Sequence, residues 1–125
     1  MVLIIGGAYQ GKRLYAEELY PNVAWLDGRT CKEEDIFRCQ GIHHFHSYIQ
    51  RMMREGKDLE NFAGKLMTEN PGLILVSDEI GCGIVPVDPF DRQYREMTGR
   101  VCTQLAACAE EVYRVVCGIG MRIKG

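Results

Sequence analysis

Short apolar runs alternate with segments of helical period along this chain. The runs predict strands at 2–7, 22–28, 72–79 and 112–118, with a short additional strand at 119–125. Most of these runs are continuous rather than alternating between apolar and polar residues. Strands buried on both faces, as in a parallel sheet, have this pattern.

Segments with apolar residues at helical spacing lie between the runs and predict helices. Pro21 is expected to stop the first helix and Gly56 to close the second, while Asp58 is a candidate cap for the third. A polar stretch at 32–40 predicts a short helix, and 80–93 is punctuated by glycine and proline as in a loop. The predicted longer helices are 11–21, 41–56, 58–72 and 90–111.

This alternation predicts an α/β fold with a mostly parallel sheet flanked by helices. The 125 residues are expected to form one domain spanning 1–125. Ligands of such sheets bind outside the carboxyl ends of the strands. The strand ends "GGAYQGK", "LDGR" and "SDEIGCG" are therefore expected to converge.

Composition narrows the class of protein. Hydrophobic residues make up 46% and charged residues 26%, as in ordinary globular proteins. The net charge of -2 gives no basic surface for nucleic acid, and no apolar run approaches the roughly 20 residues of a membrane helix. The N-terminus has no basic segment of a signal peptide, so the expected location is the cytoplasm. The six cysteines form no CxxC pair, so they are expected to be reduced rather than bound to zinc.

The stretch "IIGGAYQGKRL" has the features of a phosphate-binding loop between a strand and a helix. Glycines let backbone N–H groups point at a phosphate, and a lysine neutralises the outer phosphates. The alternative is a strand-to-helix turn that is merely rich in glycine. The predicted nucleotide-binding residues are Gly6, Gly7, Ala8, Tyr9, Gln10, Gly11, Lys12 and Arg13.

Arg13 stands where such loops have Ser or Thr, whose hydroxyl binds Mg²⁺. A guanidinium has no acceptor atom and cannot bind a metal ion. Three alternatives follow: other groups hold the magnesium, Arg13 contacts phosphate directly, or kinase chemistry is weakened.

Two further groups of residues offer chemistry. The segment "HHFH" carries His43, His44 and His46, which on a helix place His43 and His46 three residues apart. An imidazole serves as nucleophile, base or metal ligand, and the alternative is a surface helix with ordinary polar histidines. Asp78 and Glu79 end a buried strand, where carboxylates hold Mg²⁺ or orient an attacking hydroxyl; the alternative is a turn cap.

Three stretches together resemble one family. "IIGGAYQGK" resembles the "TGGARSGKS"-type loop of the adenosylcobinamide kinase/adenosylcobinamide-phosphate guanylyltransferase family. "LVSDEIGCGIVPVD" is similar to its "VTNEVGxGIVPE" segment, and "GRVCTQLAACAEEVYRVVCGIGMRIK" is similar to its "GRVNQxLAxxADEVxxVVxGIxxxIK" ending. The resemblance covers residues 1–20 and about 72–124 well, and the middle loosely.

The resemblance implies a P-loop NTPase-like fold and two linked reactions. The family phosphorylates the aminopropanol hydroxyl of adenosylcobinamide with GTP or ATP, then transfers GMP from GTP to that phosphate through a guanylyl-histidine. Carried over by motif, the nucleophile falls on His44 or His43, with His46 in reserve, and Glu79 is a further candidate catalytic residue. Asp78 and Glu79 are the candidate Mg²⁺ ligands. The substrates implied are adenosylcobinamide and its phosphate, and the assembly implied is a homo-oligomer.

The chain departs from the family at defined places. Lys12-Arg13 replaces Lys-Ser, Asp78-Glu79 replaces Asn-Glu, and Cys102-Thr103 replaces Asn-Gln. A long middle portion of the family, including a strand with an acidic end, has no counterpart here. The sequence therefore supports three hypotheses: a cobinamide salvage enzyme, a non-catalytic nucleotide-binding or corrinoid-sensing module, and a structural protein.

Overall fold

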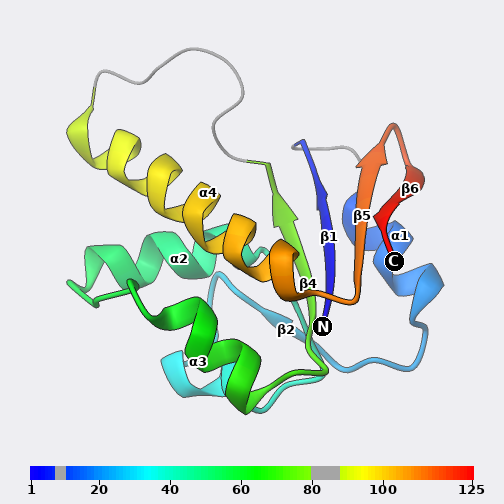
Figure 1. Cartoon of the computed structure of the whole chain (residues 1–125), viewed down its shortest axis with the longest axis horizontal. Coiled ribbons are helices and arrows are strands. Elements are labelled where there is room, and N and C mark those ends of the chain that lie inside the picture. The colour runs from blue at the N-terminus through cyan, green and yellow to red at the C-terminus, as the bar shows by residue number, and fades with distance from the viewer. Residues whose placement is uncertain (8–10, 80–87) are drawn as a thin grey trace.

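A six-stranded sheet with strand order β2-β3-β4-β1-β5-β6 organises the chain (Figure 1). The computed structural model describes residues 1–7, 11–79 and 88–125. Strands β1 to β5 pair in parallel, and only β6 runs antiparallel to its neighbour β5. The strands are β1 (Val2–Gly6), β2 (Trp25–Asp27), β3 (Gly41–His43), β4 (Ile74–Asp78), β5 (Glu111–Val116) and β6 (Ile119–Lys124). The predicted α/β class with a mostly parallel sheet is confirmed.

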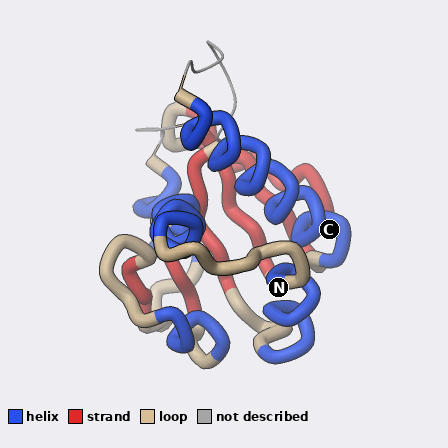
Figure 2. Tube along the Cα trace, turned by 90° about the vertical axis from the view of Figure 1, so that its left-hand side faces the viewer, coloured by secondary structure: helices blue, strands red, loops and turns tan. Residues whose placement is uncertain are grey.

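Helices cover both faces of the sheet (Figures 1 and 2). Alternate residues of a strand point to opposite faces, so neighbours on β1 enter different cores. Leu3 packs with the three-helix side and Ile4 with the α1 side. The helices are α1 (Lys12–Leu19), the 3₁₀ helix η1 (Glu33–Phe37), α2 (Phe45–Arg54), α3 (Phe62–Glu69) and α4 (Pro89–Cys108). None of the helices within the described residues is both long and apolar enough to cross a membrane.

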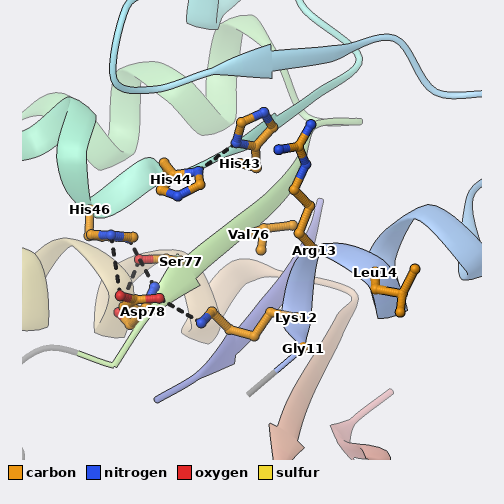
Figure 3. Close-up of a pocket in the computed structure, with 10 residues that line it drawn as sticks. All are labelled: Gly11, Lys12, Arg13, Leu14, His43, His44, His46, Val76, Ser77 and Asp78. Atoms are coloured by element: carbon orange, nitrogen blue, oxygen red, sulfur yellow. Dashed lines mark hydrogen bonds and ion pairs between the residues drawn. The ribbon is translucent and has the colours of Figure 1, made fainter. Parts of the chain in front are cut away.

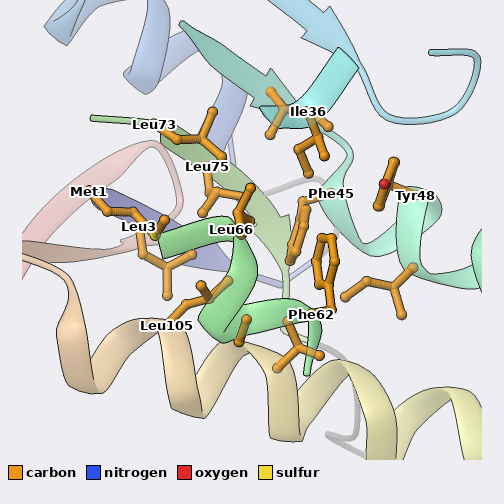
Figure 4. Packing of buried hydrophobic residues seen from close by; sticks show 14 of the residues in the cluster. Met1, Leu3, Ile36, Phe45, Tyr48, Phe62, Leu66, Leu73, Leu75 and Leu105 are labelled. Carbon is orange, nitrogen blue, oxygen red and sulfur yellow. The ribbon is translucent and has the colours of Figure 1, made fainter. Parts of the chain in front are cut away.

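The larger core lies between the sheet and helices α2, α3 and α4 (Figure 4). Phe62 stacks on Phe45 and on Tyr48, with ring centroids 6.2 and 5.7 Å apart. Leu66 and Leu105 are completely buried beside them. Burying side chains of this size contributes about 1.5–3 kcal/mol each. This packing places the start of α2 beside the carboxyl end of β4.

The predicted helix over 41–56 is wrong in its first turn. Residues 41–43 form strand β3, which pairs in parallel with both β2 and β4. His44 then takes a left-handed conformation (φ 55°) as the N-cap, and α2 begins at Phe45. A three-residue buried strand has too few positions to show its period, so pairing with its neighbours decides its conformation.

Other element boundaries are shorter than predicted. Helix α3 begins at Phe62 rather than Asp58, whose Oδ1 instead accepts from the N–H of Glu60 in the preceding turn. The strand expected at 22–28 is reduced to 25–27. Asp88 caps α4 by accepting from the N–H of Phe90, and most of the predicted loop at 80–93 lies outside the described residues.

Candidate functional site

The glycine-rich turn joins β1 to α1 at the carboxyl edge of the sheet. Gly6 ends β1, and Gly7 accepts a hydrogen bond from Lys12 Nζ at 2.8 Å. Gly11 is left-handed (φ 81°), and a Cβ there would lie 3.2 Å from the Cα of Gly118 in the β5–β6 turn. Gly11 therefore needs glycine for its backbone conformation and for this contact. The predicted loop residues Ala8, Tyr9 and Gln10 lie outside the described residues.

Lys12, the first residue of α1, reaches across to the end of β4. Its Nζ lies 2.5 Å from Oδ1 of Asp78, and the lysine is 7% exposed. The ends of β1 and β4 are brought together because Gly6 and Asp78 are register partners. The structure therefore brings the glycine-rich loop and the carboxylate of Asp78 together, as expected from the converging strand ends.

His46, in the first turn of α2, holds Asp78 from the other side. The N–H of Asp78 donates to His46 Nδ1 at 3.0 Å, and His46 Nε2 lies 3.4 Å from Oδ2 of the same residue. Because Nδ1 accepts, the neutral imidazole carries its proton on Nε2, facing the carboxylate. Burial lowers the pKa of His46, partly offset by Asp78. Both nitrogens are thus committed to Asp78.

His43 and His44 form a close pair above this carboxylate (Figure 3). Their Nδ1 atoms lie 2.6 Å apart, and His43 is 4% exposed. Burial, followed by the charge of Arg13, lowers the pKa of His43 to about 4. Burial also lowers the pKa of His44. Both rings are therefore neutral at pH 7, and these are not ordinary surface histidines.

Asp27 is a neighbour of this pair that sequence reasoning missed as a site residue. It is the register partner of His43 on β2, and ligand atoms of Asp27, His43 and His44 all lie within 4.8 Å of one another. Both oxygens of Asp27 are bonded to Arg29, at 2.9 to 3.2 Å, which keeps the pKa of Asp27 well below its usual range. The sequence signal that could have identified Asp27 was the expectation that the strand end "LDGR" converges with the other strand ends.

Asp27 and two neutral imidazoles are a donor set that suits a transition metal. Electrostatics oppose a cation here, because Arg29 already occupies both carboxylate oxygens. Arg13 adds a further positive charge beside His43. The charges around the histidine pair therefore disfavour a divalent ion at these three residues.

The turn after β2 is hydrogen-bonded to, and packed against, the backbone of the histidine pair. Gly28 donates its N–H to the carbonyl of His43 at 2.9 Å. A Cβ on Gly28 would lie 2.2 Å from the carbonyl oxygen of His44, so glycine is required there by close contact. Arg51 of α2 donates to the carbonyls of Gly28 and Cys31 at 2.9 and 2.6 Å.

These groups open into one pocket of about 380 Å³ (Figure 3). The side chains that matter for chemistry come from four elements: Lys12 and Arg13 of α1, His43 of β3, His44 and His46 at the start of α2, and Asp78 of β4. The pocket combines a lysine placed as in phosphate-binding loops with neutral imidazoles in a partly buried space. Such a combination can bind a phosphorylated ligand and attack it.

Glu79 points elsewhere. Its carboxylate pairs with Arg114 of β5, with Oε1 3.0 Å from Nε, and its N–H donates to the carbonyl of Gly6. Of the two carboxylates predicted to bind Mg²⁺, Glu79 is therefore held by Arg114 and Asp78 by Lys12. As arranged, these residues do not form an open set of oxygen ligands for Mg²⁺.

The family model described as "Cobinamide kinase / cobinamide phosphate guanyltransferase" matches residues 41–123. The chain belongs to this family. The match includes all three histidines and the end of β4, and it begins after the phosphate loop and Asp27. The mostly parallel sheet with its flanking helices is the P-loop NTPase-like fold of the family.

Two curated relatives are bifunctional adenosylcobalamin biosynthesis proteins CobU. The Escherichia coli (strain K12) protein is 52% identical over 52 residues, which are 42% of this chain and 29% of the relative. The Salmonella typhimurium (strain LT2) protein is 50% identical over 52 residues, which are again 42% of this chain and 29% of the relative. The chain thus matches less than a third of the length of these members of the cobinamide kinase and guanyltransferase family.

Proposed function

We propose that this chain is a nucleotide-dependent cobinamide salvage enzyme of cobalamin biosynthesis. It phosphorylates adenosylcobinamide, transfers GMP from GTP to adenosylcobinamide phosphate, or does both. The observation that carries the proposal is the neutral, mutually bonded pair of His43 and His44, which opens into the same pocket as Lys12. Family membership supplies the substrate class.

The phosphate half of the proposal rests on Lys12 and Arg13. Lys12 begins α1, whose N-terminus carries a partial positive charge toward the pocket. Arg13 is about half exposed and extends toward His43 (Figure 3), so its guanidinium can reach phosphate oxygens at the rim. A GTP or ATP triphosphate would lie between these cations and the histidine pair.

The transfer half assigns the nucleophile to His44. His46 has both nitrogens engaged with Asp78, and His43 is more deeply buried than His44. His44 has one nitrogen against His43, and its other nitrogen is turned toward the Asp78 side of the pocket (Figure 3). A neutral imidazole nitrogen with a free lone pair is the form that attacks phosphorus.

The direct test is incubation with GTP labelled at the α-phosphate, followed by denaturing electrophoresis. The expected result is a labelled protein band in the wild type that disappears in His44→Ala and persists in His46→Asn. A phosphorus–nitrogen bond should be lost in acid and kept in alkali. Absence of the band in the folded wild-type protein overturns the transfer half.

A non-catalytic nucleotide-binding or corrinoid-sensing module is the second candidate. The pairing of Asp78 with Lys12 and of Glu79 with Arg114 favours it, because neither carboxylate is presented to a metal. Calorimetry with GTP and Mg²⁺ separates the two functions. Binding without turnover supports the module, while a purely structural role predicts that Lys12→Ala changes no ligand measurement.

Self-association is proposed through edge strand β6, with a second copy of this chain as the partner. Ile119, Met121 and Ile123 are 69%, 50% and 58% exposed on this edge. An apolar edge strand is a template for pairing with another chain. Light scattering should show an oligomer that Met121→Lys dissociates, and a monomeric wild type contradicts this.

A further inference from the structure

We propose that Asp27 and His43 are positioning residues for His44, holding its proton on Nδ1 so that Nε2 faces the pocket as an unprotonated nucleophile. The inference rests on the proposed function in one respect, because it takes His44 as the nucleophile. It adds a role for His43 that can be tested without any reaction, and a role for Asp27 that is tested by the rate of adduct formation.

The close contact within the histidine pair carries the argument. Two imidazole nitrogens at 2.6 Å are compatible with one proton between them, since one nitrogen must donate and the other accept. If the proton belongs to His43, neutral His44 carries its own proton on Nε2 and has no lone pair for the pocket. If the proton belongs to His44 Nδ1, its Nε2 is free to attack.

Asp27 favours the second arrangement. It lies opposite His43 in the β2–β3 register, and its carboxylate is kept ionised by Arg29. With His44 donating, the other proton of neutral His43 lies on Nε2. The negative charge of Asp27 also stabilises positive charge that develops on the substituted ring of His44, because ligand atoms of the two residues lie within 4.8 Å of each other. Arg13 and Arg29 oppose that charge, so removing Asp27 would leave it less compensated.

The local backbone fixes the positions of His43 and His44 relative to each other. His44 is held in a left-handed conformation that a non-glycine residue rarely adopts, and such strain is common at functional sites. Gly28 packs against the carbonyl of His44 and bonds to that of His43. The turn that carries Asp27 is therefore fastened directly to the histidine backbone.

The chemical step balances through this pair. The lone pair of His44 Nε2 forms a bond to the α-phosphorus of GTP, the bond from that phosphorus to the bridging oxygen breaks, and pyrophosphate leaves. The positive charge stays on the substituted ring of His44, whose Nδ1 proton is held by the hydrogen bond to neutral His43. When a phosphate oxygen of the acceptor attacks the same phosphorus, the bonding pair returns to Nε2 and His44 is neutral again.

Nitrogen NMR of protein labelled at histidine tests the positioning directly, because only 3 histidines contribute signals. In the wild type at pH 7.5, His44 is expected to show a protonated Nδ1 and an unprotonated Nε2. His43→Leu should shift His44 toward the opposite tautomer. His43→Asn should restore the original one, because its side-chain oxygen accepts at the position of Nδ1.

The rate of GMP-adduct formation is the second measurement. Asp27→Asn is expected to slow it at least tenfold with little change in the concentration of GTP for half-saturation. Asp58→Asn is the matched control, since Asp58 also accepts from the N–H two residues on, at 2.9 Å as for Asp27, and it does not belong to the group that Asp27 forms with His43 and His44. Thermal unfolding of each variant confirms that it is folded.

The two proposals fail in different ways. A wild-type His44 protonated on Nε2 overturns the positioning role, even if the adduct forms. Equal adduct rates for Asp27→Asn and wild type overturn the role of Asp27. Absence of any adduct in a wild type that has the expected tautomer overturns the proposed transfer and leaves the positioning of the ring supported.

Discussion

Lys12 and Asp78 are joined directly across the pocket, with Nζ 2.5 Å from Oδ1 and the lysine almost fully buried. The lysine expected to meet phosphate is thus neutralised by a strand-end carboxylate. A triphosphate must draw Lys12 away from Asp78 or be accompanied by a cation that offsets the carboxylate. At contact distance, like charges in such a site interact by about 4 kcal/mol, so one of the two must occur.

Asp78→Asn tests this relationship. We predict that chelating Mg²⁺ weakens GTP binding to the wild type, because Asp78 then faces the phosphates without a cation. The variant should bind GTP equally well with and without Mg²⁺, and more tightly than wild type under chelation. Titration calorimetry measures all four affinities. Glu79→Gln is the matched control, since Arg114 holds Glu79, and it should retain the wild-type Mg²⁺ dependence.

A wild type whose GTP affinity is the same with and without chelator would contradict a metal-bridged site. A variant that binds more weakly than wild type under chelation would contradict the repulsion argument.

Arg13 is predicted to act on phosphate in place of a metal-binding hydroxyl. Among the described residues Arg13 pairs with Glu17 on the same helix, at 3.0 Å, and both side chains are exposed, so the guanidinium can turn to a ligand at small cost. A hydrogen bond to a charged group contributes about 1.5–3 kcal/mol, so Arg13→Ala should weaken GTP binding at least about tenfold. The free energy of unfolding should change by less than about 0.5 kcal/mol.

Glu17→Gln is the control for Arg13→Ala, because it removes the partner and keeps the cation. It should leave GTP affinity unchanged or raise it slightly. Unaltered binding in Arg13→Ala would rule out direct contact with phosphate.

Gly28→Ala is predicted to disturb the site through backbone contact alone. The added Cβ would meet the carbonyl oxygen of His44 at 2.2 Å, so the turn or the histidine pair must move. Overpacking of this kind costs about 1–3 kcal/mol of unfolding free energy. The rate of GMP-adduct formation should fall as well, because the histidine pair is displaced. Gly64→Ala, at an exposed position of α3, meets nothing within 4 Å and should stabilise by about 1 kcal/mol.

Urea unfolding of both glycine variants measures the difference. Equal stability of Gly28→Ala and wild type would show that the close contact is relieved at no cost. It would contradict the requirement for glycine at this position.

Local features of the site and the convergence of the strand ends were predictable, whereas most specific contacts between side chains of distant segments were not. Gly6, Gly11 and Lys12 follow from a strand, a turn and a helix that are contiguous in sequence. Asp78 follows from the end of a buried run. The link between His46 and Asp78 joins residues 32 apart, which no local pattern reveals.

Strand pleating explains why two predicted neighbours separate. Asp78 and Glu79 are adjacent, and successive side chains along an extended chain point to opposite sides. Asp78 faces Lys12, while Glu79 faces Arg114. Likewise, Asp27 and His43 meet only because β2 and β3 pair in parallel, and β3 itself was predicted as helix. The register of the sheet therefore determines these contacts, which composition and periodicity do not predict.

The stability of the protein is predicted to fall as the pH drops from about 6.5 to 4. His43 has a pKa of about 4 in the folded chain against an ordinary 6.5, so the unfolded state binds more protons across this window. Burial also lowers the pKa of His44 and of His46, which adds to the same slope. His43→Asn removes one of these groups and should reduce the loss between pH 7.5 and 5 by on the order of 1 kcal/mol, since each unit of pKa displacement corresponds to about 1.4 kcal/mol and only part of the window is crossed. Urea unfolding at both pH values measures this, and the same loss in wild type and variant would contradict a neutral, buried His43.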